Sequence, residues 1–559
     1  MIAALLCTSL VAACAGDRVT GSSFQSRSVA YGARGMIATS IPQATLAGLD
    51  MLRAGGSAAD AAIAANAVLC VAEPTGCGVG GDLFAMAWNP REKRVEGLES
   101  SGASPRGLRL EEFEERGIAR IPSFGPLPIS TPGCVEGWIA LHARHGKLPL
   151  AKVLEPAIKA ATEGVPVADL VAHYWERSVA RLSGEANFVA EMTLDGRAPK
   201  KGELWRNPGL AKVLERVARE GRAGFYEGET ARAIVASTRA AGGHLSLEDL
   251  AAHRAAWTTP VSLDYRGVRV WELPPPGQGV AALQILGMLE RFDLRAMGRA
   301  SEAWIHHFVE AKKLAFEDRA RWYADPAFVD VPVAGLVSDD YCAERAGLIG
   351  AKSAKRVEAG NPALEQGDTI CLAAADESGL MVSLVQSNYR GMGSGVAVAG
   401  HGFVLQNRGE MFDLARGRAN TYAPGKRPFH TIIPCILTRA DEPWVAFALM
   451  GGAMQPQGHA QIVVNLVDFD LDLQEAGDAP RILHEGSSEP TGERMLDGGR
   501  VNLEAGHEWE VVRALLRRGH VVGWNDGEYG GYQAVMRDRE RGVWIGASES
   551  RKDGLALGH

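Results

Sequence analysis

The chain has 559 residues, of which 46% are hydrophobic and 23% charged, a composition typical of a globular protein with room for several domain-sized cores. Its 67 acidic residues outnumber its 59 lysines and arginines, so the formal net charge is −8. Because the sequence has neither a basic surplus nor a run of five or more like charges, we expect no nucleic-acid partner.

Residues 1–21 are predicted to be a signal or lipoprotein-like leader. Their apolar run is too short to span a bilayer as a mature helix, and it ends in small residues. Val-Ala-Ala-Cys at 11–14 resembles a bacterial lipoprotein cleavage box, which makes Cys14 a candidate lipid anchor and the protein periplasmic or membrane-anchored. No Lys or Arg precedes the apolar run, and a wrongly assigned start would instead leave a cytoplasmic protein. Residues 22–34 are expected to be a flexible leader.

The eight cysteines form no metal-binding pattern. Six lie beyond the leader, mostly in apolar contexts typical of free core thiols. No Cys-x-x-Cys or paired-histidine spacing indicates zinc, so we expect neither a metal nor a cofactor. Pairing of Cys70 with Cys77 in an exported protein stays open.

Two alanine-rich helices are predicted at Ala44–Arg53 and Ser57–Val71, ended by a glycine pair and by Pro74. The glycines at 76–81 formally fit Gly-x-Gly-x-x-Gly. A dinucleotide site needs the order strand, glycines, helix, whereas here a helix precedes the glycines and a strand, Leu83–Trp88, follows them. The sequence therefore predicts a tight turn that leads into a central strand.

The middle of the chain, residues 150–321, is predicted to be mostly helical. One helical face there carries an apolar stripe typical of core, namely Trp304, Phe308, Ala311, Ala315 and Trp322. After residue 369 the chain becomes rich in strands, with a further helix expected at Gln474–Ala479. Residues 361–367, which are polar, are expected to be flexible.

Thr369 follows Gly-Asp at the start of an apolar strand and is the candidate nucleophile. A threonine hydroxyl needs a base, and cleavage of the Asp368–Thr369 bond would supply one as the free α-amino group of the same residue. That amine has an ordinary pKa of about 7.7–8.0, so part of it is unprotonated near neutral pH. The pair Asp368 and Thr369 is thus the predicted autocleavage site.

Several ordered motifs lie after and before Thr369. They are Asp-Glu-Ser-Gly at 376–379, Gln-Ser-Asn-Tyr-Arg-Gly-Met-Gly-Ser-Gly at 386–395, Lys-Arg-Pro at 426–428, Gly-Gly at 451–452, Gly-Gly-Ser-Ala-Ala-Asp at 55–60, Pro-Gly-Cys-Val-Glu-Gly-Trp at 132–138 and Pro-Pro-Pro-Gly at 274–277. Together with Thr369 these motifs resemble the γ-glutamyltransferase family of N-terminal-nucleophile hydrolases, closest to its acylase-like branch. The small subunit of this family begins with the catalytic threonine and continues with a strand, an Asp-x-x-Gly turn, a second strand, a hydroxyl residue and Gly-x-Gly.

This resemblance implies an α/β fold, a four-layer αββα sandwich built from two subunits of one precursor. The large subunit would comprise residues 35–368 and the small subunit residues 369–559. It also implies a cofactor-free amidohydrolase that forms a threonyl acyl-enzyme from a small-molecule or peptide amide and passes the acyl group to water or an amine.

The resemblance further assigns roles to single residues. Ser387 matches the hydroxyl residue that holds the nucleophile. Gly451 and Gly452 match the glycines whose N–H groups form the oxyanion hole, where each donor contributes roughly 3–4 kcal/mol in known cases. Thr431 matches one of two serines that bind the substrate carboxylate, and His430 stands in place of the other.

Departures from the family pattern change which substrate we expect the site to recognise. Ser101 stands where the family has the arginine for the α-carboxylate, Met411 replaces the aspartate for the α-ammonium group, and Tyr389 replaces an asparagine. Loss of a partner for a desolvated charge costs several kcal/mol. Arg408 adds a cation that suits an acyl group with a plain carboxylate, whereas Glu410 is the alternative partner for an ammonium group.

Three functions follow from these residues. The first is a self-processing amidohydrolase acting on γ-glutamyl-type or related side-chain amides. The second is a cephalosporin or glutaryl acylase-like amidase. The third is a non-catalytic, surface-attached binding lipoprotein, against which the retention of Thr369, Ser387, Gly451 and Gly452 argues.

Overall fold

The computed structural model describes residues 24–357, 369–525, 527 and 529–559. The predicted leader with Cys14, the segment 361–367 and Asp368 lie outside the described residues. Among the described helices, none combines the length and the apolarity needed to cross a bilayer.

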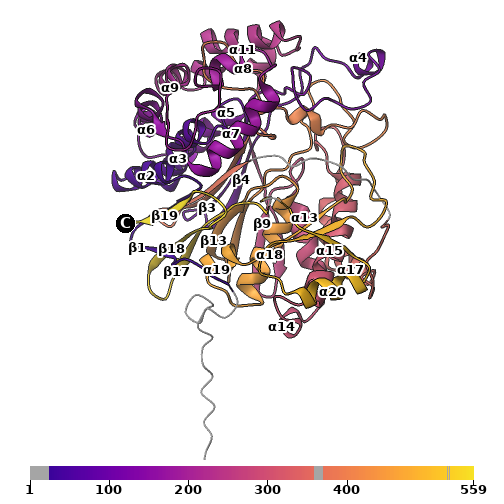
Figure 1. The fold of residues 1–559 in the computed structure, drawn as a ribbon. Coiled ribbons are helices and arrows are strands. Elements are labelled where there is room, and N and C mark those ends of the chain that lie inside the picture. The colour runs from indigo at the N-terminus through magenta and orange to yellow at the C-terminus, as the bar shows by residue number, and fades with distance from the viewer. Residues whose placement is uncertain (1–23, 358–368, 526, 528) are drawn as a thin grey trace, which may run out of the picture.

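Two seven-stranded antiparallel sheets form the centre of the molecule (Figure 1). Sheet I has the order β1 (Ala30–Gly32), β18 (Val543–Ser548), β17 (Tyr532–Asp538), β13 (Glu442–Leu449), β12 (Pro434–Arg439), β9 (Val268–Glu272) and β8 (Val261–Tyr265). Sheet II has the order β19 (Leu555–Gly558), β2 (Met36–Thr39), β10 (Ile370–Ala375), β11 (Met381–Ser387), β3 (Asp82–Asn89), β4 (Arg94–Ser100) and β7 (Ala256–Thr258).

The sheets pack face to face through a core that draws residues from both, among them Phe84 and Val385 of sheet II and Ile436 and Val535 of sheet I. Helices cover the two outer faces (Figure 1). The strands of sheet II pack against α2 (Pro42–Arg53), α3 (Ala58–Ala72) and α5 (Cys134–His145), and α6 (Leu150–Glu163), α7 (Asp169–Leu182), α9 (Pro208–Glu220) and α11 (Gly228–Ala240) complete the same hydrophobic core. The strands of sheet I pack against α13 (Gly279–Leu289), α18 (Met454–Val467) and α19 (Leu473–Asp478), and α15 (Glu302–Trp322) and α20 (Trp509–Arg517) complete the core on that side. The predicted αββα sandwich is confirmed.

The remaining elements are short. They are α4 (Leu110–Glu115), α8 (Phe188–Met192), α10 (Ala223–Tyr226), α12 (Leu247–Ala252), α14 (Leu294–Met297), α16 (Val333–Leu336), α17 (Asp339–Ala346), the 3₁₀ helix η1 (Arg408–Met411), β5 (Val165–Pro166), β6 (Leu204–Trp205), β14 (Ile482–Glu485), β15 (Arg500–Leu503) and β16 (Val521–Gly523).

The predicted alanine-rich helices are α2 and α3. A capping box starts α3: the Ser57 side chain accepts from the Asp60 N–H, and the Asp60 carboxylate accepts from the Ser57 N–H. Every residue of α3 is buried. Its small side chains suit a helix enclosed by α2, α6 and sheet II, because they let neighbouring backbones approach.

The turn at 76–81 leads into β3, as predicted, and β3 pairs with β11 so that Asp82 lies opposite Ser387. The apolar stripe of α15 is buried from Trp304 to Ala315, whereas Trp322, at the end of the helix, is only half-buried. The helix predicted at 474–479 is α19.

Both sheets contain strands from either side of the predicted autocleavage site. In sheet II, β10 and β11 insert between β2 and β3, and β19 closes the edge beside β2. In sheet I, β9 and β8 extend a sheet whose other central strands come after residue 369. The two predicted subunits are therefore interleaved rather than adjacent.

Candidate active site

Thr369 lies immediately before β10, and its side chain faces the end of β11. The antiparallel register pairs Ile370 with Gln386, which places Thr369 opposite Ser387. The Thr369 hydroxyl donates to Ser387 Oγ at 3.3 Å, and Ser387 Oγ also accepts from the Tyr389 N–H at 2.8 Å. Thr369 is 3% exposed. The structure therefore brings the predicted nucleophile and the predicted second hydroxyl together.

The glycine turn at 76–81 closes over this strand pair. The Gln386 side chain accepts from the Gly78 N–H at 3.0 Å and donates to the Gly78 carbonyl at 2.8 Å, which fixes the turn against β11. A Cβ at Gly76 would lie 3.4 Å from the Thr369 carbonyl, so the turn runs beside the backbone of the candidate nucleophile. The glycines at 76–81 thus lie next to the strand pair that carries Thr369 and Ser387.

Gly451 and Gly452 lie between β13 and α18 with φ of 109° and 53°, values that favour glycine. Their carbonyls accept from the Met454 N–H at 2.8 Å and the Gln455 N–H at 3.2 Å. The end of β13 also lies beside β10, because the Cys371 thiol donates to the Ala448 carbonyl at 3.3 Å. The two glycine residues are therefore carried by the sheet that faces the strand of Thr369.

Arg408, on η1, is completely buried and points toward the predicted substrate-binding residues. Its Nη1 donates to Thr431 Oγ1 at 2.7 Å, and its guanidinium lies 4.5 Å from the centre of the Tyr389 ring. Burial lowers the pKa of Arg408 to about 10, so the group remains charged at neutral pH. Its Nε and Nη2 have no hydrogen-bond partner among the described residues. Arg408 thus has two buried N–H donors, Nε and Nη2, to which an anion could bind.

Asp82 is a functional candidate that sequence reasoning missed. Its carboxylate accepts from the Gly102 N–H at 3.0 Å, from Gln406 Nε2 at 2.8 Å and from His430 Nε2 at 2.8 Å, and it lies 4.0 Å from Arg408 Nε. Burial raises the pKa of Asp82 to about 7, against the opposing effect of Arg408. The available signal was an acidic residue directly after the glycine turn, at the start of an otherwise apolar strand.

His430 is fully buried and donates to Asp82 from Nε2. Burial, together with the positive charge of Arg408, holds the pKa of His430 well below its usual range. The imidazole is therefore neutral near pH 7. It acts here as a hydrogen-bond donor between Asp82 and the segment that carries Thr431, and its ring packs 4.6 Å from that of Phe84.

Glu410 has a guanidinium partner that the sequence did not reveal. Arg390 binds its carboxylate through two hydrogen bonds, both of 2.7 Å, and Ser123 Oγ donates a third at 2.8 Å. This carboxylate is therefore already neutralised. The Glu410 carboxylate therefore lacks the free acceptor oxygens that a substrate ammonium group would need. Arg408, in contrast, has N–H groups that donate no hydrogen bond to the described residues.

The other predicted substrate-binding residues lie at the margin of this group. Tyr389 has φ of 76° and presents its ring to Arg408. Ser101 is buried, and its hydroxyl has no hydrogen-bond partner among the described residues. Met411, which replaces the family's aspartate, is buried in the core beneath sheet I. The structure thus joins Thr431, Tyr389 and Arg408, and leaves the Ser101 hydroxyl unpaired.

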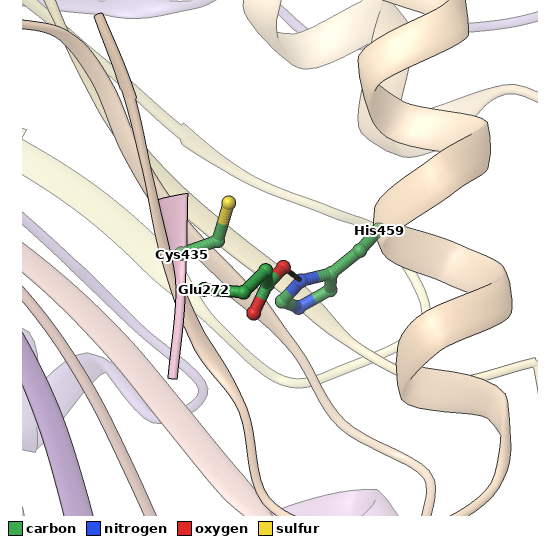
Figure 2. A group of neighbouring side chains, drawn as sticks. All are labelled: Glu272, Cys435 and His459. Carbon is green, nitrogen blue, oxygen red and sulfur yellow. Dashed lines mark hydrogen bonds and ion pairs between the residues drawn. The ribbon is translucent and has the colours of Figure 1, made fainter. Parts of the chain in front are cut away.

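Two buried clusters have donor atoms of the kind that bind metals. In the first, Glu272 of β9, Cys435 of β12 and His459 of α18 have their donor atoms within 4.8 Å of one another. Figure 2 shows the imidazole facing the carboxylate, and His459 Nδ1 lies 2.7 Å from Glu272 Oε1. The second ring nitrogen of His459 has no partner among the described residues, whereas metal-bound histidines almost always donate from it. Three donors also leave a tetrahedral ion one ligand short.

The second cluster contains His306, Glu310 and His520. Both ring nitrogens of His306 are engaged, Nδ1 with His520 Nε2 at 2.8 Å and Nε2 with the Gly350 carbonyl at 2.7 Å. We read both clusters as hydrogen-bonded core groups and assign no metal to either. The six cysteines of the described chain are free, Cys70 and Cys77 included.

Comparisons with known proteins agree with this architecture. The family described as Gamma-glutamyltranspeptidase matches residues 44–559. The glutathione hydrolase-like YwrD proenzyme of Bacillus subtilis is 34% identical over 94% of this chain and 99% of its own length. The acylase ACY 1 proenzyme of Pseudomonas sp. (strain SE83) is 35% identical over 94% of each chain. The crystal structure of a cephalosporin acylase from Bacillus halodurans superposes with a TM-score of 0.89 and 40% identity, over 95% of this chain and 97% of that one.

The two sequence relatives are proenzymes, and the matches extend over both predicted subunits and both sheets. The chain belongs to the γ-glutamyltranspeptidase family and is an amidohydrolase with the N-terminal-nucleophile fold.

Proposed function

We propose that Thr369 cleaves the chain before itself and then cleaves the side-chain amide of an acyl donor that ends in a carboxylate. In maturation, Thr369 Oγ1 attacks the Asp368 carbonyl, the Asp368–Thr369 C–N bond breaks, and the nitrogen takes the hydroxyl proton. Water then hydrolyses the resulting ester. The products are a large subunit ending in Asp368 and a small subunit whose free amine is the base of its own nucleophile.

In turnover, the Thr369 amine accepts the hydroxyl proton as the oxygen attacks the substrate amide carbon. The 3.3 Å contact with Ser387 orients the hydroxyl. The N–H groups of Gly451 and Gly452 stabilise the tetrahedral oxyanion, the leaving amine takes the proton, and water or an amine resolves the acyl-enzyme.

The buried guanidinium of Arg408 carries the assignment of substrate class. It is fixed by Thr431 and Tyr389 and lies 4.0 Å from the Asp82 carboxylate. Its Nε and Nη2 donate no hydrogen bond to any described residue. A carboxylate is the anion that matches two parallel guanidinium donors. Glu410 is held by Arg390, so an adjacent ammonium group would find its carboxylate already paired. A dicarboxylic acyl group such as glutaryl therefore fits better than γ-glutamyl.

The test combines maturation with substrate choice. Purified protein is expected to yield two fragments, the smaller beginning Thr-Ile-Cys-Leu, with Thr369→Ala remaining one chain and Thr369→Ser still processing. Glutaryl-p-nitroanilide should be hydrolysed with a higher kcat/KM than γ-glutamyl-p-nitroanilide. Arg408→Ala should lower kcat/KM for the glutaryl compound about 10- to 100-fold more than for the uncharged pentanoyl analogue.

Two results would contradict this proposal. An active Thr369→Ala variant would show that Thr369 is not the nucleophile. A preference for the γ-glutamyl compound that survives Arg408→Ala but is lost in Glu410→Gln would show that the site recognises an α-amino acid head group, as expected of a glutathione hydrolase.

A further inference from the structure

Gln278 is a buried residue whose side-chain amide links two separate parts of the candidate site. Its Nε2 donates to the Thr431 carbonyl at 2.7 Å and to the Gly452 carbonyl at 2.8 Å. Both amide hydrogens are thus donated in hydrogen bonds. One goes to Thr431, which binds Arg408, and the other goes to the turn of the proposed oxyanion hole. These acceptors are 153 and 174 residues away in the sequence.

The orientation of this amide is set by Arg319 of α15. Arg319 Nη1 donates to Gln278 Oε1 at 2.6 Å, so the oxygen faces the guanidinium and the NH₂ group must face the two carbonyls. Arg319 is itself held by an ion pair with Glu489 and lies 3.7 Å from the Phe316 ring. Gln278 and Arg319 are both fully buried, so these hydrogen bonds are shielded from bulk solvent.

The Gln278 side chain does not cap its own helix. Gln278 is the N-cap residue of α13, yet its side chain makes no capping hydrogen bond there. The side chain is therefore committed entirely to the loops that meet at the candidate site.

The oxyanion turn needs such an anchor because it consists of glycines. Gly451 and Gly452 adopt left-handed φ values and, lacking a Cβ, have access to several other backbone conformations. Oxyanion donors are effective only when their N–H groups are aimed before the reaction begins. Holding the Gly452 carbonyl restricts the rotation of the turn that carries those N–H groups.

We propose that Gln278 is a positioning residue for catalysis, which fixes the oxyanion turn relative to the anion-binding pair of Thr431 and Arg408. This inference rests on the proposed function, since it takes Gly451 and Gly452 as the oxyanion donors. Gln278 holds the turn whose N–H groups meet the oxyanion, so its larger effect is on the transition state and its smaller effect, through Thr431, is on ground-state binding.

The test is Gln278→Glu, an isosteric change that keeps the contact with Arg319 but turns a carboxylate oxygen toward two carbonyl oxygens. In processed enzyme, kcat for the best p-nitroanilide substrate should fall about 10- to 100-fold with KM changed less than about threefold. The Ki of a boronic acid that forms a tetrahedral adduct at Thr369 should rise in parallel. Inhibition by the free acid product should weaken less than inhibition by the boronic acid.

Gln284→Glu is the matched control. Gln284 lies on the same helix, is equally buried, donates to Asp318 Oδ2 at 2.8 Å and accepts from the Tyr323 hydroxyl at 3.0 Å. The control should lower the melting temperature but leave kcat within about twofold of the wild-type value.

The inference is overturned if Gln278→Glu keeps kcat within about twofold, or if Gln284→Glu loses kcat equally. If Gln278→Glu does not accumulate as folded protein, Gln278→Asn is measured instead, since it keeps the amide but shortens its reach; a fully active Asn variant also overturns the inference. Failure of the proposed function is recognised separately, because it appears as activity in Thr369→Ala whatever Gln278 does.

Discussion

At the scale of single residues, Asp82 links the groups that would recognise a substrate. It accepts from His430 and lies 4.0 Å from the guanidinium of Arg408, and all three side chains are buried. The charge of Asp82 therefore decides how much of the Arg408 charge remains for a bound anion. Because burial raises the pKa of Asp82 to about 7, this charge changes in the physiological range.

We expect KM for a glutaryl substrate to depend on pH through Asp82. Below about pH 7 the carboxyl is protonated and Arg408 is uncompensated, whereas above about pH 7 the carboxylate offsets it and binding weakens. KM should therefore rise with pH, by up to about tenfold between pH 6 and pH 8. Steady-state kinetics at each pH measure this, with the uncharged pentanoyl substrate as reference.

Asp82→Asn is the control for this pH dependence, since it cannot ionise. Its KM for the glutaryl substrate should be flat over the same range, while kcat keeps the titration of the Thr369 amine. If KM of Asp82→Asn rises with pH as much as KM of the wild type, another group is responsible for the titration.

At the scale of elements, the glycine turn between α3 and β3 determines how closely the walls of the site approach. A Cβ at Gly80 would lie 2.0 Å from the Val404 carbonyl oxygen, and one at Gly81 would lie 2.4 Å from the Ser387 carbonyl oxygen. Both contacts are with backbone, which cannot swing aside as a long side chain can. The glycines are therefore required by close packing of backbone and not by phosphate binding.

Gly80→Ala should destabilise the protein by about 1–3 kcal/mol or more, because the new methyl group forces two packed backbone segments apart. It should also slow self-cleavage, since the same turn runs beside the Thr369 backbone. Gly184→Ala serves as the control, because a Cβ there meets no atom within 4 Å and no positive φ is involved. Thermal melts and the rate of fragment formation test both points; equal melting temperatures for the two variants would contradict the packing argument.

At the scale of the whole molecule, the two predicted subunits share both sheets. The first strand of the small subunit, β10, pairs with β2 of the large subunit on one side, and β11 pairs with β3. The last strand, β19, also pairs with β2. Cleavage before Thr369 would therefore cut the chain without dividing either the hydrogen-bonded sheets or the core between them.

After maturation the two fragments should remain one particle. We expect them to co-elute in size-exclusion chromatography, to melt in a single transition and to separate only in denaturant, because separation would expose the core of both sheets. Chromatography of processed protein with and without guanidinium chloride measures this. Separation of native fragments in dilute buffer would show that the interleaved strands do not hold the subunits together.

Much of the fold was predictable from local sequence. The alanine-rich helices, the glycine turn that leads into a strand, the apolar stripe of α15 and the layered αββα arrangement all follow from periodicity, capping residues and family motifs. These signals lie within short windows, and a short window determines local conformation well. Thr369 was likewise marked by local sequence, through its position after Gly-Asp at a strand start, and its role as nucleophile stays a prediction.

Only the tertiary structure shows which charged side chains contact one another. Glu410 and Arg408 are two residues apart, yet Glu410 pairs with Arg390 while Arg408 faces Thr431 and Tyr389. Asp82 reaches His430 across 348 residues, and Gln278 reaches Gly452 across 174. Such pairings depend on strand register and on how the two sheets stack, and a side chain's partner changes completely when either shifts by one residue. The sequence by itself thus determined the family and the layers and predicted Thr369 as the nucleophile, whereas the packing of the sheets determined which buried groups lie next to one another.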